Sequence, residues 1–404
     1  MKIVVLKFGG TSLGSIGRIK NVAKIIATYL KKRNKVIVIC SAMSGQTNKL
    51  VKLTKQISTN FDKSEYDAVV ATGEQVSSSL LAGRMTDIGY LSRSWLGWQI
   101  PIITQGNHSH SRIVKINKNN VLKFLKKGGV PIISGFQGIN NKNRITTIGR
   151  GGSDASAIMM AKFFNAEKCI IYTDVDGVYT TDPKIVPKAK KISKISYEEM
   201  LEMASLGAKV MQPHSIQDAR MNRIDIEVRS TFKNTPGSLI TKKKNISTKN
   251  IIRGVSFTKN DTKITLVGVK DRPGVAATIF EPLFKNLINV DMVVQNISSS
   301  KNETDLTFTI KNDDLLKTRK LISKNNKIKF RKLLIDEKVS KVSIVGVGMI
   351  TTPGVTFRMF NALAKKNINI LVISTSEIKI SVLVDRKNLK KSVDVLHKEF
   401  KLDY

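Results

Sequence analysis

The run of residues 135–157, GFQGINNKNRITTIGRGGSDASA, limits the possible folds more than any other part of this chain. It predicts two short strands around a polar hairpin tip at residues 140–143, because Asn and Lys separate two apolar flanks there. The second strand, residues 145–148, is rich in β-branched residues. A glycine-rich bend follows and leads into ASAIMMAKFF, whose apolar residues recur at helical spacing. A strand that turns at once into a helix is typical of α/β domains.

The glycine-rich bend predicts an anion-binding site. Glycines before a helix let backbone N–H groups approach an anion, and the first helical turn adds unpaired donors with partial positive charge. Arg150 supplies a planar fork of donors that fits a carboxylate or a phosphate. Ser153 and Asp154 stand where helix-capping residues are common, so for Ser153 a capping role and a ligand role are both open.

The chain has 404 residues, enough for two or three domains, and a formal net charge of +37. Such a charge raises the possibility of nucleic-acid binding. The lysines are scattered, however, and no basic stripe interleaved with aromatic residues occurs, so we do not expect a nucleic-acid partner. The charge is expected instead to attract small anions.

The cysteines and histidines predict no metal centre or disulfide. Cys40 and Cys169 lie in separate apolar runs and are expected to be buried thiols of a cytoplasmic protein. The four histidines have no metal-ligand spacing, and His108 and His110 are expected to be solvated. No apolar run is long enough to span a membrane, and the chain starts with a strand pattern that leaves no room for a signal peptide.

The N-terminal 230 residues alternate between strand and helix patterns. An apolar strand at residues 2–8 leads into Gly9 and Gly10, with Lys7 directly before them, and a phosphate contact is favoured over a lysine that only reaches water. A second strand, residues 35–40, ends in a loop of small residues, 41–48, and ligands bind at such strand ends in open α/β sheets. Further strands are expected at residues 99–104, 130–135, 168–173 and 226–230, and helices at 16–32, 67–84, 121–127 and 196–206.

Two further segments carry polar residues. Gly73 and Glu74 fall within the expected helix at 67–84, where a glycine indicates close approach of another group. Residues 174–184, DVDGVYTTDPK, begin with Asp-x-Asp-Gly but lack the remaining oxygen ligands of a calcium loop. We expect a turn that holds a nucleotide, with Tyr179 as an aromatic wall.

The C-terminal part contains an internal repeat. Pro273-Gly274 and Pro353-Gly354 each follow a strand pattern and precede a helix, and a further strand and helix complete each copy. The expected unit is βαββαβ, twice. A Lys/Asn/Ser-rich stretch near residue 245 marks the boundary, giving domains at 1–245 and 246–404, with units at about 263–335 and 336–404 and an added strand from residues 251–257.

At this point the sequence resembles the aspartate kinases of the amino-acid kinase superfamily. The resemblance covers essentially the whole chain and is carried in order by KFGGTS, SAMSGQT, TGE, the GFQG to GRGGSD run and YTDVDGVYTTDP. It implies an α/β fold with an α/β/α sandwich followed by two ferredoxin-like ACT units. It also implies phosphoryl transfer from MgATP to the β-carboxylate of L-aspartate, with no tightly bound cofactor and no dedicated metal site.

The same resemblance implies residue roles. The catalytic group would be Lys7, Asp154 and Lys209; aspartate would be held by Ser41, Thr47, Glu74, Arg150 and Ser153. ATP would be held by Lys7, Phe8, Gly9, Gly10, Thr173, Asp174, Tyr179, Asp182, Lys184 and Lys209. Two positions depart from the family pattern: Lys184 stands where arginine is frequent, and Ala155-Ser156 where threonine is common.

The ACT resemblance implies feedback inhibition by lysine, threonine or both, and pairing of ACT units in a homo-oligomer. The effector residues would be Asp271, Pro273, Gly274, Val275, Ala276 and Gln295, with Pro353, Gly354, Val355, Thr356, Asn369 and Ile370 in the second copy. The alternative is that Pro-Gly only starts a helix. Rival functions are a kinase for glutamate or acetylglutamate, a non-catalytic amino-acid sensor, and nucleic-acid binding.

Overall fold

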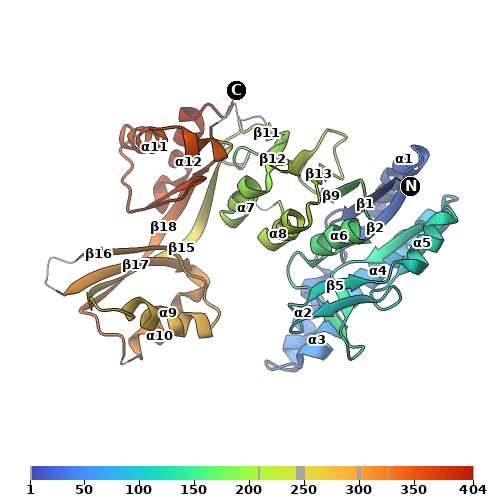
Figure 1. Ribbon diagram of the computed structural model, residues 1–404, viewed down its shortest axis with the longest axis horizontal. Helices are drawn as coiled ribbons and strands as arrows, with labels where there is room; N and C mark the ends of the chain where they lie inside the picture. Colours follow the sequence, from blue (N-terminus) through green and yellow to red (C-terminus); the bar gives the residue numbers. More distant parts are fainter. Residues whose placement is uncertain (1, 208–209, 243–250, 298–301, 326, 404) are drawn as a thin grey trace. The chain divides into compact units, whose positions relative to one another are not determined.

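The computed structural model describes residues 2–207, 210–242, 251–297, 302–325 and 327–403 (Figure 1). The chain forms two compact units. The first contains residues 1–178, 191–205 and 209–247, and the second contains residues 179–190, 206–208 and 248–404. A short loop region of the N-terminal half, residues 179–190, is therefore part of the second unit.

An eight-stranded sheet forms the centre of the first unit, in the order β12-β14-β13-β9-β1-β2-β6-β3. Its strands are parallel except for the antiparallel pair β13 and β14. The strand bounds are β1 Ile3–Phe8, β2 Lys35–Cys40, β3 Ser92–Trp95, β6 Val130–Ser134, β9 Lys168–Thr173, β12 Lys194–Ser196, β13 Ile226–Ser230 and β14 Ser238–Thr241. Because β1 and β9 are buried strands paired on both sides, they read as continuous apolar runs.

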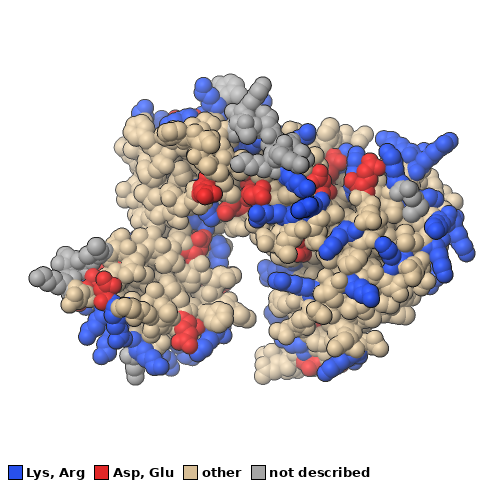
Figure 2. Space-filling view, viewed as in Figure 1, with Lys and Arg blue, Asp and Glu red and all other residues tan. Residues whose placement is uncertain are grey.

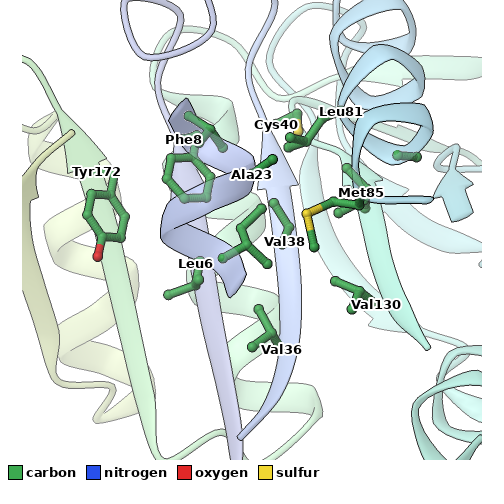
Figure 3. Close-up of a cluster of buried hydrophobic side chains, with 14 of the residues drawn as sticks. Leu6, Phe8, Ala23, Val36, Val38, Cys40, Leu81, Met85, Val130 and Tyr172 are labelled. Atoms are coloured by element: carbon green, nitrogen blue, oxygen red, sulfur yellow. The ribbon is translucent and has the colours of Figure 1, made fainter. Parts of the chain in front are cut away.

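Helices cover the sheet in an α/β/α sandwich, which confirms the expected fold class. On one face α1 (Ile16–Lys31) packs beside α4 (Thr72–Asp87), and the other face carries α6 (Gly152–Phe163) and α8 (Pro213–Asn222). Figure 3 shows the core between the sheet and α1 and α4, where Leu6, Val38 and Met85 meet. The remaining helices are α2 Gln46–Ile57, α3 Lys63–Val70, α5 Asn119–Lys126 and α7 Tyr197–Ser205.

Alternation along β1 decides where its polar residue goes. Val4, Leu6 and Phe8 belong to the core that contains α1 and α4. Because successive side chains of a strand point to opposite faces, Lys7 points to the other face, which α6 covers. The position of Lys7 in β1 thus places its ammonium group at the start of α6.

A second, four-stranded sheet in this unit has the order β5-β4-β7-β8. Its strands are β4 Ile102–Gln105, β5 Arg112–Ile116, β7 Gln137–Ile139 and β8 Ile145–Thr147, and β7 and β8 form the expected hairpin. Two short strands, β10 Val178–Tyr179 and β11 Lys191–Ile192, also occur. β3 and β5 were not predicted, because SRSW and RIVKI carry too many polar residues to stand out as buried strands.

The helix expected at residues 67–84 is two helices, α3 and α4, which meet at Ala71. Gly73 is in the first turn of α4, and a Cβ built on it would lie 2.8 Å from the Cβ of Ala42. The glycine therefore permits close packing of α4 on the loop after β2, as its position suggested.

The second unit contains a six-stranded antiparallel sheet in the order β16-β17-β15-β18-β20-β19. Its strands are β15 Gly254–Lys270, β16 Asp291–Ile297, β17 Glu303–Lys311, β18 Lys332–Val345, β19 Val372–Thr375 and β20 Lys379–Asp385. Its helices are α9 Val275–Lys285, α10 Leu315–Ser323, α11 Val355–Ala364 and α12 Leu389–Glu399, with short 3-10 turns at Asn312–Asp314, Val347–Thr351 and Arg386–Asn388.

The two long strands β15 and β18 each serve both copies of the repeat. Residues 254–258 of β15 pair with residues 341–345 of β18, and residues 263–267 pair with residues 332–336. Of the expected added strand at residues 251–257, residues 254–257 are thus the first part of β15, and residues 251–253 precede it. Each copy keeps its own core, one around Phe308 and one around Met359. The repeat therefore forms one continuous sheet over two cores.

Lys and Arg side chains are spread over both units in the view of Figure 2. Within the described residues, no helix has the length and apolar character needed to cross a bilayer.

Candidate active site

A buried ion pair links β1 to the start of α6. Lys7 Nζ lies 2.6 Å from Asp154 Oδ1, and each side chain is 10% exposed. Asp154 is in the first turn of α6, and Lys7 is the fifth residue of β1. Since a buried charge is tolerated only when it is paired, each residue fixes the other. The pair holds the ammonium group at the end of the central strand, beside Gly9.

Glu74 is a buried carboxylate on α4 with one free oxygen. Its Oε1 accepts from the Ala42 N–H at 3.0 Å, while Oε2 is buried and has no hydrogen-bond partner in the described part of the chain. Burial raises the pKa of Glu74 to about 7, opposed by the hydrogen bond from Ala42 and by the charge of Lys7. A cationic donor that pairs with Oε2 would stabilise this carboxylate and favour its ionised form.

The loops after β1 and β2 approach each other so closely that glycine is needed. A Cβ on Gly10 would lie 2.9 Å from Ala42 O, and the Ser44 N–H donates to Gly10 O at 3.1 Å. The Gly9 N–H donates to Tyr172 O at 3.1 Å. The expected donation from Gly9 to a phosphate is thus not supported in this structure, because that N–H is already used.

Phe8 contributes only backbone to this edge. Its side chain is fully buried, and its ring stacks on Tyr172 with centroids 4.9 Å apart (Figure 3). Phe8 O accepts from the Ser41 N–H at 3.1 Å, which ties the two loops together. The expected ATP contact of Phe8 can therefore involve backbone atoms but not the ring.

Arg150 lies between two glycines in the left-handed conformation, Gly149 (φ 82°) and Gly151 (φ 72°). Gly151 is the residue that caps α6, so Ser153 and Asp154 are in the first helical turn. The capping alternative for Ser153 is wrong, because no side chain caps this helix. Ser153 lies instead near Gly135, where a Cβ on the glycine would be 3.0 Å from the Ser153 Cβ. Arg150 is exposed and precedes Asp154 by four residues.

Asp67 is a fully buried acid that sequence reasoning did not select. Its carboxylate lies 2.7 Å from His108 Nδ1 and accepts from the backbone N–H groups of Ser109 (3.0 Å) and Thr147 (3.1 Å). Hydroxyl bonds from Ser109 and Thr147 complete the set. His108, which was expected to be solvated, is thus a structural partner of this acid. The cluster joins α3, the loop before β5 and the strand β8, two residues before Gly149.

The other expected aspartate and nucleotide residues are distributed over several segments. Ser41 follows β2, Thr47 is in the first turn of α2, and Thr173 ends β9 with its hydroxyl donating to Asp174 at 3.1 Å. Tyr179, Asp182 and Lys184 belong to the second unit, where the Lys184 N–H donates to Asp182 Oδ1. Lys209 lies outside the described residues.

The expected effector residues lie at matched places in the two copies of the repeat. Gly274 and Gly354 cap α9 and α11 with nearly the same left-handed backbone, φ 85° and 87°. Pro273 and Pro353 precede them, and Asp271, Thr356 and Asn369 are exposed; Val275, Ala276 and Val355 are in the first helical turns.

A cavity of about 340 Å³ in the second unit is lined by residues of β15, β16, β17 and β19 and by the segment before β19. Ile370 lines it together with Val294 and Asn296. Gln295 is between those two residues on β16 and does not line the cavity, since strand alternation turns it to the opposite face. Ile370 therefore shares this cavity with Val294 and Asn296 and not with Gln295.

Within the described residues, no group of three or more His, Cys, Asp or Glu side chains is arranged to hold a metal ion. Cys40 and Cys169 are free and buried, as expected, and burial strongly raises the pKa of both thiols. Neither can act as a nucleophile at neutral pH.

Comparison with known proteins decides the family. The profile of the amino acid kinase family matches residues 2–230, and that of the ACT domain matches residues 264–325 and 342–400. An aspartate kinase of Pseudomonas putida is 44% identical over 405 residues, covering 100% of this chain and 98% of that protein. The chain belongs to the aspartate kinases of the amino acid kinase family. It is therefore an ATP-dependent kinase with C-terminal ACT domains.

Other members of this family agree with the assignment. Aspartokinase 2 of Bacillus subtilis is 41% identical and covers 100% of the chain and 98% of its own length. The structure of E. coli aspartokinase III with aspartate and ADP has a TM-score of 0.79 at 25% identity, covering 98% of this chain and 99% of that one. The same enzyme with lysine and aspartate has a TM-score of 0.80, covering 99% and 100%.

Proposed function

We propose that this aspartate kinase transfers the γ-phosphoryl group of MgATP to the β-carboxylate of L-aspartate, giving 4-phospho-L-aspartate. The observation that carries the proposal is the buried Lys7–Asp154 pair together with Glu74, whose Oε2 has no partner in the described residues. The fixed cation is Lys7, and the anion without a donor is Glu74. Together they suit a phosphoryl acceptor that carries both a carboxylate and an ammonium group. The structure of the E. coli relative with aspartate and ADP supports the same substrate pair.

The reaction joins two anions, so charge neutralisation and positioning carry most of the catalysis. The aspartate carboxylate attacks the γ-phosphorus directly and is already deprotonated, so no general base is needed. Lys7 stabilises the charge on the phosphoryl group in transfer, and Lys209 adds a second cation. Asp154 keeps Lys7 in position through the 2.6 Å ion pair.

Aspartate is held at both of its ends. Its ammonium group pairs with Glu74 Oε2, which brings the raised pKa of that carboxyl down. Its α-carboxylate binds Arg150, whose planar fork gives two parallel hydrogen bonds. Ser41, Thr47 and Ser153 supply hydroxyl groups around the acceptor.

ATP brings its own Mg²⁺ as part of the substrate. We assign its binding to Gly10, to backbone atoms of Phe8, and to side chains from the end of β9 and the segment that follows it. These side chains are Thr173, Asp174, Tyr179, Asp182 and Lys184, with Lys209 at the phosphates.

The product is an acyl phosphate on the route to lysine, threonine, methionine and diaminopimelate, and we place the reaction in the cytoplasm, where ATP is made.

Residues 1–245 form the catalytic region and residues 246–404 the regulatory region. Lysine, threonine or both inhibit the kinase by binding at the Pro-Gly turns of the ACT units. The ACT units also pair two chains in a homodimer. The lysine complex of E. coli aspartokinase III supports this form of regulation.

The test is a coupled assay of ATP consumption with aspartate or glutamate as acceptor, with hydroxylamine trapping of the acyl phosphate. We expect turnover with aspartate only. Turnover with glutamate alone would assign a different acceptor, and ATP binding without any turnover would favour a sensor.

Arg150→Ala tests the assignment of the α-carboxylate. We expect KM for aspartate to rise about tenfold or more, with KM for ATP little changed, because a bidentate charged contact is lost. Arg144→Ala, an exposed arginine on the same hairpin, is the matched control. If the ATP requirement rises instead, Arg150 binds the nucleotide.

A further inference from the structure

A cavity of about 600 Å³ lies in the first unit at the edge strand β3 and the helix α5. None of its lining residues is among those assigned above to aspartate, ATP or an effector. Its volume is in the range of small-molecule pockets. The feature is therefore a second candidate binding site.

The wall of this cavity is aromatic. Trp95, Trp98 and Phe124 line it, and Trp95 and Phe124 meet edge to face with centroids 5.9 Å apart. Trp98 is 49% exposed, which is unusual for the largest apolar side chain. An exposed indole offers a flat face on which another ring can stack.

The polar groups around the cavity are mostly hydrogen-bond donors. Arg93, Lys123 and Lys127 line it, and the guanidinium of Arg93 lies 4.5 Å from the centroid of the Trp95 ring. Among the described residues, none of these three cations has an ion-pair partner within 4 Å, and no Asp or Glu lines the cavity. A site with three cations and no acid selects an anion.

One of the lining residues, Trp95, carries a buried donor. Trp95 is 5% exposed, and its Nε1 is buried without a hydrogen-bond partner in the described part of the chain. Buried indole N–H groups normally find an acceptor, because an unpaired one costs free energy. Because this donor is buried, a ligand in the cavity would reach it only after a shift of the Trp95 side chain.

We propose that this cavity binds a nucleobase with an attached phosphate. The nucleobase stacks on the exposed face of Trp98, and Lys123 and Lys127 neutralise the phosphate. Arg93, which is held over the Trp95 ring, lies beside the base and the phosphate. The chemistry is shared by a free mononucleotide and by a nucleotide within a single strand. The site is separate from the kinase reaction and does not depend on the proposed acceptor.

The experiment uses the fact that Trp95 and Trp98 are the only two tryptophans in the chain. Intrinsic tryptophan fluorescence therefore comes only from side chains that line this cavity. Guanosine 5′-monophosphate is titrated into the full-length protein, with guanosine and inorganic phosphate as single-feature controls. We expect a saturable change with the nucleotide and a much weaker one with guanosine or phosphate at equal concentration.

The variant Lys123→Gln with Lys127→Gln removes the two helix cations. We expect the dissociation constant for the nucleotide to rise about tenfold or more, because two charge-assisted hydrogen bonds are lost. Lys126→Gln is the matched control, since Lys126 is exposed on the same helix and does not line the cavity. Basal kinase turnover should be unchanged in both variants.

Three further results decide the proposal. The titration is repeated with Lys7→Ala, and the change must persist there if it does not come from the kinase site. A single-stranded octathymidylate that binds more tightly than the mononucleotide, with steep salt dependence, would make the strand the source. No saturable change with either probe, or an unchanged dissociation constant in the double variant, would overturn the proposal.

Discussion

At the scale of the residue, the site is built from groups that are costly to bury and that compensate one another. Lys7 and Asp154 are each 10% exposed and 2.6 Å apart, and Glu74 is 3% exposed with one oxygen lacking a partner in the described residues. Buried ionisable groups of this kind, one of them with an unpaired oxygen, cluster at functional sites. The arrangement agrees with a site poised for an ionic substrate.

Lys7→Ala is expected to lower kcat about 100- to 1000-fold, because it removes one group that stabilises charge in the transition state. Turnover is measured as aspartate-dependent ATP consumption, and circular dichroism checks that the fold is kept. Lys2→Ala is the control, because Lys2 directly precedes β1 and its side chain is 76% exposed. This variant should behave like the parent protein. A near-normal kcat for Lys7→Ala would remove this residue from the mechanism.

Glu74 predicts a pH dependence of aspartate binding. Since burial raises its pKa to about 7, the ionised form that pairs with the ammonium group is lost as the pH falls through 7. KM for aspartate should therefore rise between pH 8 and pH 6. In Glu74→Gln it should be raised at all pH values and flat over this window. A pH profile identical to that of the parent protein would contradict the assignment.

The same shift has a consequence for stability without substrate. The folded pKa is raised above the ordinary value of 4.5, so the folded state holds the proton more tightly than the unfolded state. The contribution of Glu74 to stability is present below about pH 4.5 and is lost as the pH rises through about 7. Glu74→Gln should remove this part of the pH dependence in urea unfolding followed by circular dichroism.

At the scale of the element, the bend before α6 is held by contacts that are distant in sequence. Asp67 on α3 accepts from Ser109 and from Thr147, the last residue of β8. Thr147 precedes Arg150 by three residues, so this acid positions the arginine through backbone bonds. Sequence reasoning did not find it, because an Asp near the end of an amphipathic helix looks like a solvated residue.

Asp67→Asn is expected to destabilise the protein by about 2 kcal/mol, since an amide group leaves at least one buried N–H without an acceptor. It should also raise KM for aspartate through the displaced Arg150. Urea unfolding and the coupled assay measure the two effects.

Asp62→Asn is the control, because Asp62 caps the same helix from an exposed position. Asparagine also caps helices well, so we expect a change below about 0.5 kcal/mol and normal kinetics. Equal effects of the two substitutions on both readings would show that Asp67 has no special role.

The elements themselves were largely predictable. β1, β2, β6 and β9 are continuous apolar runs, and the hairpin and α6 were read correctly from the asparagine-rich tip and the glycine bend. β3 was missed because only Trp95 of its four residues is buried. The break between α3 and α4 was missed because Ala71, where they meet, carries no helix-ending signal.

At the scale of the whole molecule, the two copies of the repeat share one sheet through β15 and β18. A change at one copy can thus reach the other through strands that belong to both. This continuity is a physical basis for effector binding that alters the unit as a whole, and allostery requires such coupled states.

Asp271→Asn is expected to raise the concentration of lysine or threonine for half inhibition about tenfold, because a charged contact to the effector is weakened. The uninhibited kcat should stay normal. Asp313→Asn, an exposed acid in the same copy, is the control. Inhibition is measured with each amino acid and with both together. If the Asp271 variant is inhibited like the parent protein, the effector binds elsewhere.

The sequence by itself determined the class of fold and the repeat, because apolar runs, glycine bends and short motifs are local signals. Only the tertiary structure decided that Ser153 does not cap its helix, that the Gly9 N–H is already used, and that Asp67 holds the arginine turn. Those facts depend on which groups meet across the fold. Hydrogen-bond partners and burial are set by packing, and no local pattern encodes them.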